Sequence, residues 1–170
     1  RNRIMFPIKN EKGQVIGFSG RIIEDSEEAK YINSPNSEVY DKGKSFYNLD
    51  LAIESIKKNR EAVLVEGVLD VIGLYRKGVR PVIAPLGTGF TEIHARLLKK
   101  YCDKVYLMFD SDQAGKKSAF RSIGYFEKEN IQSAVCVIEN FKDPFDFAKD
   151  KSKELVRNFI SKSLKSYSYS

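Results

Sequence analysis

Six acidic residues stand at positions in the sequence where metal chemistry is feasible. They form three pairs: Glu66 with Asp70, Asp110 with Asp112, and Asp143 with Asp146. Each pair comes at or shortly after the end of a short apolar segment. Like charges gathered in one crevice repel each other and resist ionisation, and a hard cation relieves that repulsion. Because Mg²⁺ prefers carboxylate oxygens together with waters and substrate phosphates, the pairs predict a shared divalent-cation site.

Taken singly, these motifs have ordinary structural explanations. An Asp-x-Asp after a strand also occurs in simple turns, and Asp143-Pro144 has the form of a helix start, with Asp as N-cap and Pro in the first turn. The prediction rests on the combination, in which all three pairs reach the same edge of one sheet. We expect one negatively charged hollow that contains Glu66, Asp110, Asp112 and Asp143.

The segments that must position these pairs alternate between strand and helix from residue 49 onward. Compact apolar runs predict strands at 62–65, 81–84, 105–109 and 134–138. Helical spacing of apolar residues predicts helices near 51–56 and over 68–77, 91–101 and 113–128. This alternation implies an α/β fold with a mostly parallel four-stranded sheet, covered by helices on both faces. Ligands gather beyond the carboxyl ends of such strands, which is where the acidic pairs fall.

The two flanking regions differ from this central pattern. Apolar runs at 4–8 and 15–23 flank a turn at 10–13, which predicts a β-hairpin, and turn signals continue to residue 43. Beyond Pro144 the apolar spacing is helical. The chain is therefore divided into residues 1–48, 49–146 and 147–170.

Composition limits the class of protein. The 170 residues are 42% hydrophobic and 31% charged, which is typical of a globular chain. No apolar run approaches the roughly 20 residues of a membrane span, so we expect no membrane partner and a cytoplasmic location. The chain opens on Arg1 rather than Met, which indicates a piece of a longer protein. The formal net charge of +6 permits a polyanionic partner near a local acidic site.

Cysteine and histidine offer no zinc site here. Cys102 and Cys136 are too few and too far apart for a zinc motif or a disulfide framework, and we expect both to be buried, reduced thiols. His94 is the single histidine. We expect it to be a solvated residue on a helix.

A glycine-containing loop follows the second predicted strand. Its residues Gly87, Thr88 and Gly89 form a turn that requires positive φ, or a loop whose backbone approaches phosphate or metal. The loop lacks the lysine of a P-loop, which excludes a nucleotidase of that class. On its own it is best interpreted as a turn.

Three segments together resemble the Toprim family, a metal-binding catalytic fold of bacterial primases, topoisomerases and some nucleases. They are Val-Glu-Gly-Val-Leu-Asp at 65–70, Leu-Gly-Thr-Gly-Phe-Thr at 86–91, and Phe-Asp-Ser-Asp-Gln-Ala-Gly at 109–115. The opening of the chain resembles one branch, the bacterial DnaG-type replicative primases. That likeness is carried by residues 1–8, 17–21, 30–35, 42–43 and 46–49, and it continues to about Asp146.

This resemblance implies a fragment of a primase catalytic region. Residues 1–48 would end an N-terminal basic subdomain, 49–146 would be the Toprim metal-binding catalytic domain, and 147–170 would begin a helical subdomain. A zinc-binding domain and a helicase-binding domain would lie outside the fragment, so no zinc is expected in it. The family's last acidic motif usually reads Asp-Pro-Asp. Here Phe145 takes the third position and Asp146 follows it, which leaves Asp146 the weakest candidate ligand.

The resemblance also implies an activity, namely DNA-templated synthesis of short RNA primers from NTPs with one to three Mg²⁺ or Mn²⁺ ions. Glu66, Asp110 and Asp112 would be catalytic, and all six carboxylates are candidate ligands. Asp70 would bind metal directly or through water, and Glu66 would either bind metal or accept the 3′-hydroxyl proton. A basic surface would hold single-stranded template or nucleotide; its candidates are Arg1, Arg3, Arg21, Lys30, Asn33 and Lys42.

Partners implied in the same way are single-stranded DNA, NTPs and the RNA primer. Replicative helicase and single-strand-binding protein would be reached through the wider protein at a bacterial replication fork. Two alternatives stay open at this point. One is a topoisomerase or nuclease of the same fold, which would lack the motifs of residues 1–49. The other is a non-catalytic DNA-binding module, which metal and NTP binding would distinguish.

Overall fold

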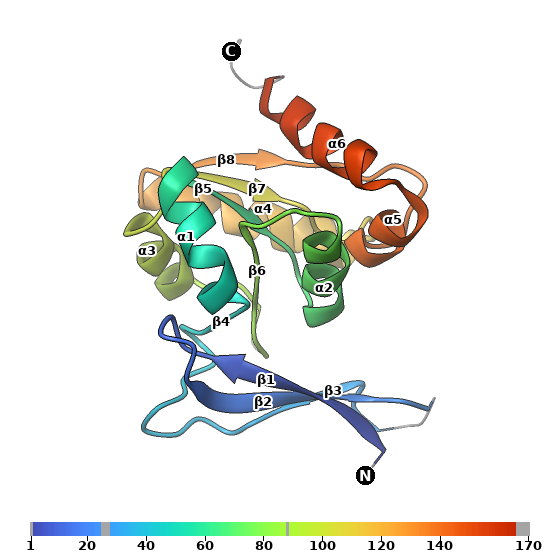
Figure 1. Cartoon of the computed structure of the whole chain (residues 1–170). Coiled ribbons are helices and arrows are strands. Elements are labelled where there is room, and N and C mark those ends of the chain that lie inside the picture. Colours follow the sequence, from blue (N-terminus) through green and yellow to red (C-terminus); the bar gives the residue numbers. More distant parts are fainter. Residues whose placement is uncertain (1, 25–27, 88, 166–170) are drawn as a thin grey trace.

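Two β-sheets and six helices make up the part of the chain that the structure describes (Figure 1). The computed structural model describes residues 2–24, 28–87 and 89–165, with the side chains of 164 and 165 left aside. The strands are β1 (Arg3–Lys9), β2 (Val15–Ile22), β3 (Tyr31–Asn33), β4 (Phe46–Tyr47), β5 (Glu61–Leu64), β6 (Val82–Pro85), β7 (Lys104–Leu107) and β8 (Gln132–Val135). The helices are α1 (Leu49–Asn59), α2 (Val68–Arg76), α3 (Glu92–Lys99), α4 (Gln113–Lys128), α5 (Pro144–Asp150) and α6 (Lys153–Lys165).

The larger sheet has the strand order β4-β6-β5-β7-β8. Its last four members pair in parallel, which confirms the predicted mostly parallel sheet. The two-residue strand β4 adds an antiparallel fifth member at the β6 edge. It was not predicted, because two residues are too short to show alternation.

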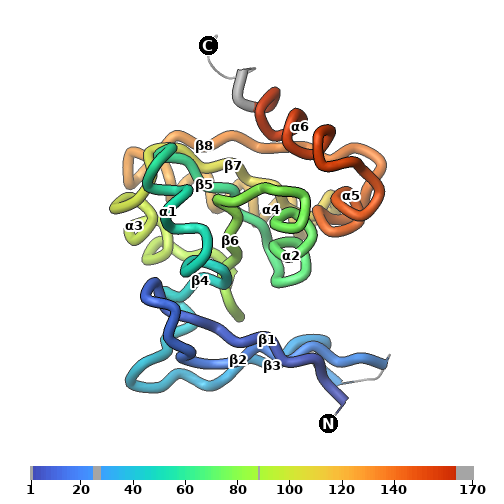
Figure 2. Tube along the Cα trace, viewed as in Figure 1, coloured from blue at the N-terminus to red at the C-terminus, as the bar shows by residue number. Residues whose placement is uncertain are grey.

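Helices cover both faces of this sheet, as predicted. On one face, α1, α3 and α4 contribute the buried side chains Ala52, Ile56, Ala95, Leu98, Ala119 and Phe126. On the other, α2, α5 and α6 contribute Val71, Leu74, Phe147, Ala148, Val156 and Ile160. Figure 2 shows the trace of these helices around the sheet. The three inner strands, β5, β6 and β7, are almost entirely buried, which explains their largely apolar sequences.

The connections of the sheet open a crevice between β5 and β7. The chain leaves β5 through α2 on one face and leaves β7 through α4 on the other. Neighbouring parallel strands whose connections run to opposite faces diverge at their carboxyl ends, and ligands bind at such a switch point. Glu66 follows β5 and Asp110 follows β7, so both acidic motifs open onto this crevice.

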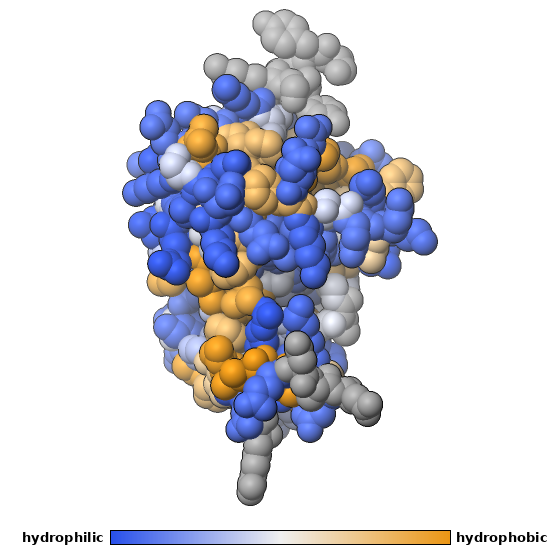
Figure 3. Space-filling model, turned by 90° about the vertical axis from the view of Figure 1, so that its right-hand side faces the viewer, coloured by the Kyte–Doolittle hydropathy of each residue, from blue (hydrophilic) through white to orange (hydrophobic). Residues whose placement is uncertain are grey.

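The smaller sheet has the order β1-β2-β3 and lies below the first in Figure 1. The predicted hairpin is confirmed, with antiparallel pairing of β1 and β2 and Gly13 at φ 80° in its turn. One face packs toward the larger sheet, where Ile8 is buried with Val68 and Leu86. The opposite face is apolar yet exposed, with Met5 and Ile32 more than half accessible. Figure 3 shows hydrophobic side chains at the surface of this lower part.

His94 is buried, so the expectation of a solvated histidine is wrong. Its ring is fully inaccessible and lies between Phe46 and Phe90, with centroids 4.8 and 5.6 Å away. Nδ1 accepts from the Thr91 N–H, so Nε2–H donates to the Ser45 carbonyl at 3.1 Å. Burial lowers the pKa of His94 to about 4, so it is neutral at pH 7. The histidine ties the β4 region to α3.

Several other local predictions can be compared with the structure. Thr91 is the N-cap of α3, and Gly78 has φ 87° shortly after the end of α2, close to the predicted end of that helix at residue 77. Cys102 and Cys136 are buried free thiols, and burial raises the pKa of the first to about 12 and of the second to about 11. The region from 147 onward is two helices rather than one, because Ser152 Oγ accepts from the Leu155 N–H where α6 begins. Among the described residues, no helix is long and apolar enough to cross a membrane.

Candidate functional site: an acidic and basic cavity

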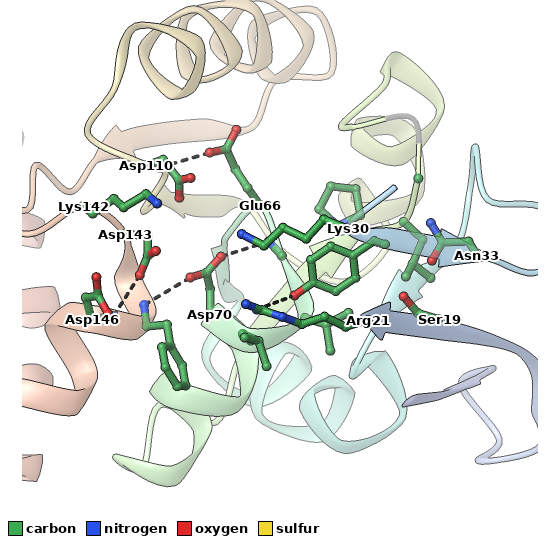
Figure 4. Close-up of a pocket in the computed structure, with 18 residues that line it drawn as sticks. Ser19, Arg21, Lys30, Asn33, Glu66, Asp70, Asp110, Lys142, Asp143 and Asp146 are labelled. Atoms are coloured by element: carbon green, nitrogen blue, oxygen red, sulfur yellow. Dashed lines mark hydrogen bonds between the residues drawn. The ribbon is translucent and has the colours of Figure 1, made fainter. Parts of the chain in front are cut away.

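A cavity of about 560 Å³ lies where the smaller sheet meets the carboxyl ends of β5, β6 and β7 (Figure 4). One wall carries the acidic residues that follow the strands, and the facing wall carries basic and polar residues of β2 and β3. The charged and polar side chains that line it are Ser19, Arg21, Lys30, Tyr31, Asn33, Glu66, Asp70, Asp110, Lys142, Asp143 and Asp146. Five of the six predicted carboxylates therefore share one cavity.

Glu66 and Asp110 are joined across the crevice between β5 and β7. Glu66 Oε2 accepts a hydrogen bond from the Asp110 backbone N–H at 3.1 Å. Burial raises the pKa of Glu66, and the charge of Asp112 adds to the rise. Because its carboxylate already accepts from a neighbouring motif, Glu66 fixes the relative position of the first two acidic loops.

Asp110 has a carboxylate oxygen that no described residue contacts with a hydrogen bond. Its Oδ1 is buried and accepts no hydrogen bond from the described residues. Burial, followed by the charges of Glu66, Asp143 and Asp112, raises the pKa of Asp110 to about 6. A buried acceptor left without a donor is costly, and a bound cation removes that cost.

Asp70 has a different position. It is only 8% exposed, and its two oxygens accept from the Gly67 and Phe145 N–H groups at 3.1 Å each. Burial and the charges of Asp110 and Asp143 raise the pKa of Asp70 to about 7. Both of its oxygens are engaged by backbone, so the geometry makes Asp70 a bridge between the start of α2 and the start of α5.

Asp143 begins α5 as the expected N-cap. Its Oδ1 accepts from the Asp146 N–H at 2.8 Å, and Pro144 occupies the first turn. Asp146 lines the cavity but is exposed. Phe145, at the position where the resemblance leads one to expect an acid, packs against α2, where a Cβ on Gly73 would lie 3.1 Å from its ring.

Asp112 does not line the cavity, in contrast to the expectation. It is exposed, and its Oδ1 caps α4 by accepting from the Gly115 N–H at 2.8 Å. The sequence predicted a helix from residue 113, directly after Asp112, but not that the Asp112 carboxylate caps this helix instead of lining the cavity. Its charge still reaches the site, because it raises the pKa of both Glu66 and Asp110.

The donor set suits a hard divalent cation bound partly by substrate. No three His, Cys, Asp or Glu side chains among the described residues are gathered closely enough to enclose a metal ion by themselves. Mg²⁺ does not require such a cage, since it commonly takes one or two carboxylates and completes its shell with water and phosphate oxygens. The unpartnered Asp110 Oδ1 beside Glu66 and Asp143 fits that mode.

The basic wall contains three of the six predicted template or nucleotide residues. Arg21, Lys30 and Asn33 line the cavity. Arg21 donates to the Tyr31 hydroxyl at 3.2 Å and lies over its ring. Asn33 also has a buried Oδ1 without a hydrogen-bond partner in the described part of the chain.

The other predicted residues of this group lie elsewhere. Arg3 has a 9% exposed side chain that donates to the Ala29 carbonyl at 2.8 Å and pairs with Glu28, so it holds the β2–β3 connection. Lys42 is outside the cavity lining and packs beside Gly87, whose Cβ would lie 3.2 Å from its side chain. Arg1 and Thr88 fall outside the described residues.

Gly87 and Gly89 confirm the expected turn. Both have positive φ, 75° and 74°, and Gly87 lines the cavity. Sequence reasoning missed Lys142, which lies directly before Asp143 and faces the acidic wall (Figure 4). Its place next to an acidic motif was the only available signal.

Comparison with known proteins places this geometry in a family. Residues 1–53 match the family model "DNA primase catalytic core, N-terminal domain", and residues 63–148 match "Toprim-like". The DNA primase of Aquifex aeolicus is 40% identical over 161 residues, which are 95% of this chain and 32% of that protein. A DNA primase of Helicobacter pylori is 40% identical over 160 residues, 94% of this chain and 28% of that protein. The chain thus spans about a third or less of these relatives.

Solved structures agree. A crystal structure of the zinc-binding and RNA polymerase domains of the Aquifex aeolicus primase matches with a TM-score of 0.89 and 40% identity, covering 95% of this chain and 40% of that one. A DnaG primase catalytic domain bound to single-stranded DNA matches with a TM-score of 0.83 and 30% identity, over 95% of this chain and 52% of that one. The chain therefore belongs to the catalytic-core family of bacterial DnaG-type DNA primases, and its central domain has the Toprim fold.

Proposed function

We propose that this chain carries the catalytic centre of a primase, which synthesises short RNA primers from NTPs on a single-stranded DNA template. The observation that carries the proposal is the cavity in which an acidic wall faces a basic one. The Toprim fold alone also suits a topoisomerase or nuclease. The match over residues 1–53 favours the primase, because those residues build the basic wall.

The reaction that fits the site is nucleotidyl transfer. The 3′-hydroxyl oxygen of a growing primer forms a bond to the α-phosphorus of an incoming NTP. The bond from that phosphorus to the bridging oxygen breaks, pyrophosphate leaves, and the hydroxyl proton passes to a base or to water. Divalent cations, Mg²⁺ or Mn²⁺, supply charge neutralisation at the attacking and leaving oxygens when bound.

Within this proposal the carboxylates have separate tasks. Glu66, Asp110 and Asp143 would hold the cations, because they line the cavity together and Asp110 has an unpartnered oxygen. Asp70 would orient the start of α5 and thereby Asp143, through its hydrogen bond to Phe145 N–H. Asp112 and Asp146 stay candidate ligands at the edge of the site.

The basic wall would bind template and nucleotide. Arg21 and Lys30 offer phosphate contacts that do not depend on base sequence, and Tyr31 beside Arg21 offers a ring on which a base could stack. One related catalytic domain has been solved with single-stranded DNA bound, which supports this template assignment. Helicase and single-strand-binding protein would be reached through other parts of the complete protein, in the bacterial cytoplasm at the replication fork.

The test replaces one carboxylate in the complete protein. Asp110→Ala is expected to reduce primer synthesis on single-stranded DNA at least 100-fold, since removal of one group that stabilises transition-state charge costs about that much. Its affinity for the template should change less than twofold, because Asp110 is not on the basic wall. Normal primer synthesis by Asp110→Ala would refute the proposal. A matched loss in Glu92→Ala, a half-buried carboxylate of α3 outside the cavity, would show that the loss was nonspecific.

A further inference from the structure

Lys142 is a cation placed at the acidic wall without a partner of its own. It lies in the connection between β8 and α5, is exposed, and lines the cavity. Its side chain points toward Asp110 and Asp143 (Figure 4). In the described part of the chain its ammonium group makes no ion pair within 4.0 Å and no hydrogen bond, although other lysines of the chain do.

The backbone of Lys142 is fixed while its side chain is free. Its carbonyl accepts from the Ser111 N–H at 3.0 Å and from Ser111 Oγ at 3.2 Å. The next residue, Asp143, caps α5. The side chain therefore starts from a point held between the Asp110 turn and the start of α5, and from there it points toward the acidic wall (Figure 4).

The charge of Lys142 is too small to neutralise this wall. Its single positive charge faces the carboxylates of Glu66, Asp110 and Asp143, which line the same cavity. Divalent cations that bind the same carboxylates would reverse the local charge and repel the ammonium group. A triphosphate bound to those cations would supply negative charge at the same place, with which the ammonium group can pair.

Across the cavity, Arg21 and Lys30 provide positive charge on the facing wall. A triphosphate held by cations at the acidic wall would thus have protein cations on both sides. Of the three, Lys142 is the one whose side chain points toward Asp110 and Asp143 (Figure 4), whereas a template strand would follow the basic wall. The position of Lys142 therefore matches the triphosphate rather than the nucleic acid backbone.

We propose that Lys142 is a phosphate-binding residue of this site, whose ammonium group contacts the triphosphate of the incoming NTP at the acidic wall. This inference rests on the proposed function and assigns it a further substrate-binding residue. It involves no covalent step. A lysine in this role binds as a point charge, so an arginine at the same position should retain part of the contact.

The experiment measures binding by the complete protein, apart from activity, and the variants are made in it. Calorimetry measures the binding of an NTP analogue that has a methylene group between its α- and β-phosphates, in the presence of Mn²⁺. Electron paramagnetic resonance measures the binding of Mn²⁺ alone. Lys142→Met should lower the affinity for the analogue about tenfold, which is the effect expected from the loss of one charged hydrogen bond. Mn²⁺ alone should bind as tightly as to the unchanged chain or more tightly, because a nearby positive charge is gone. Affinity for a single-stranded DNA oligonucleotide should stay the same.

Two variants serve as controls. Lys149→Met removes an exposed lysine of α5 that lies outside the cavity and should bind the analogue normally. Lys142→Arg should recover much of the lost affinity. Circular dichroism should show unchanged folding in all three variants, since neither lysine side chain has an ion pair or hydrogen bond with the described residues to lose.

Each outcome decides the matter. Unchanged analogue binding by Lys142→Met would overturn the inference, as would weaker Mn²⁺ binding, which would mean that Lys142 only supports the loop. Weaker DNA binding with unchanged analogue binding would assign Lys142 to the template instead. If the unchanged chain bound neither Mn²⁺ nor the analogue, the proposed function itself would fail, and that result is distinct from a difference between variants.

Discussion

At the residue scale, the acidic wall holds carboxylates where their charged forms are disfavoured. Asp70 and Asp110 have pKa values raised to about 7 and about 6, and the pKa of Glu66 is also raised. In each case burial is the largest cause and neighbouring charge follows. Such an arrangement reduces stability in the absence of cations and favours cation binding, a combination common at functional sites.

Replacing Asp110 should therefore stabilise the cation-free chain. Because the folded pKa lies above the unfolded one, the contribution of Asp110 to stability is fully present below about pH 4 and is lost as pH rises through 6. An amide does not titrate, so the advantage of Asp110→Asn over the unchanged chain should grow by about 1 kcal/mol between pH 4 and pH 8, after allowance for solvent screening. Urea unfolding at several pH values in EDTA measures the difference in unfolding free energy between Asp110→Asn and the unchanged chain. If this difference did not depend on pH, the assigned environment of Asp110 would be wrong.

Sequence reasoning identified the carboxylates but not the roles of all of them. Glu66, Asp110 and Asp143 could be predicted to converge, because strand ends meet at one edge of a parallel sheet. The start of α4 was predicted, but the direction of the Asp112 carboxylate, which caps that helix, was not. The burial of His94 depends on two aromatic rings, Phe46 and Phe90, that local helical spacing does not reveal.

At the element scale, the turn after β7 depends on close contact with the first turn of α4. A Cβ on Gly115 would lie 2.2 Å from the Asp110 carbonyl oxygen, so no side chain fits there without movement of the backbone. The turn that positions Asp110 therefore requires glycine at position 115. Gly124, in the same helix, has open space around it.

These two glycines provide a matched pair of substitutions. Gly115→Ala should destabilise the chain by about 2 kcal/mol or more, since overpacking against backbone forces it to shift. It should also weaken Mn²⁺ binding, because Asp110 moves. Gly124→Ala should stabilise the chain by up to about 1 kcal/mol through helix propensity. Denaturant unfolding and a Mn²⁺ titration test both; equal effects of the two substitutions would contradict the assigned contact.

The elements themselves were largely predictable, with informative exceptions. The parallel strands and the four helices from α1 to α4 show clear apolar spacing, and α4 begins and ends where expected. Strands β3 and β4 have three and two residues, too few to carry a pattern, and they form through pairing with β2 and β6. The break between α5 and α6 reflects capping by Ser152 rather than apolar spacing.

At the scale of the whole molecule, the cavity exists because two sheets meet. Residues of β2 and β3 supply its basic wall, and the loops after β5 and β7, together with the start of α5, supply its acidic wall. Packing of Ile8 with Val68 and Leu86 joins the two parts. This juxtaposition of segments distant in sequence could be predicted only through family resemblance, because local periodicity does not specify how two sheets dock.

The basic wall should set the salt dependence of DNA binding. If Arg21 and Lys30 each contact a phosphate, replacing both by alanine should reduce the slope of log K against log salt by about 1.4, at about 0.7 per contact for a single strand. Fluorescence anisotropy with a labelled oligonucleotide measures the slope. The control Lys58→Ala with Lys117→Ala removes two exposed charges outside the cavity and should leave the slope nearly unchanged. Equal slopes in both double variants would argue against a template-binding wall.

The most direct test of the cation site is a crystal of this chain soaked with Mn²⁺ and a non-hydrolysable NTP analogue. Anomalous scattering locates the manganese without reference to any assumed ligand. We predict a peak at Asp110, beside Glu66 and Asp143, with oxygen ligands from one or two of these carboxylates and from the triphosphate at about 2.0–2.3 Å. A well-occupied analogue with no manganese at these carboxylates, or manganese bound only elsewhere on the chain, would contradict the account.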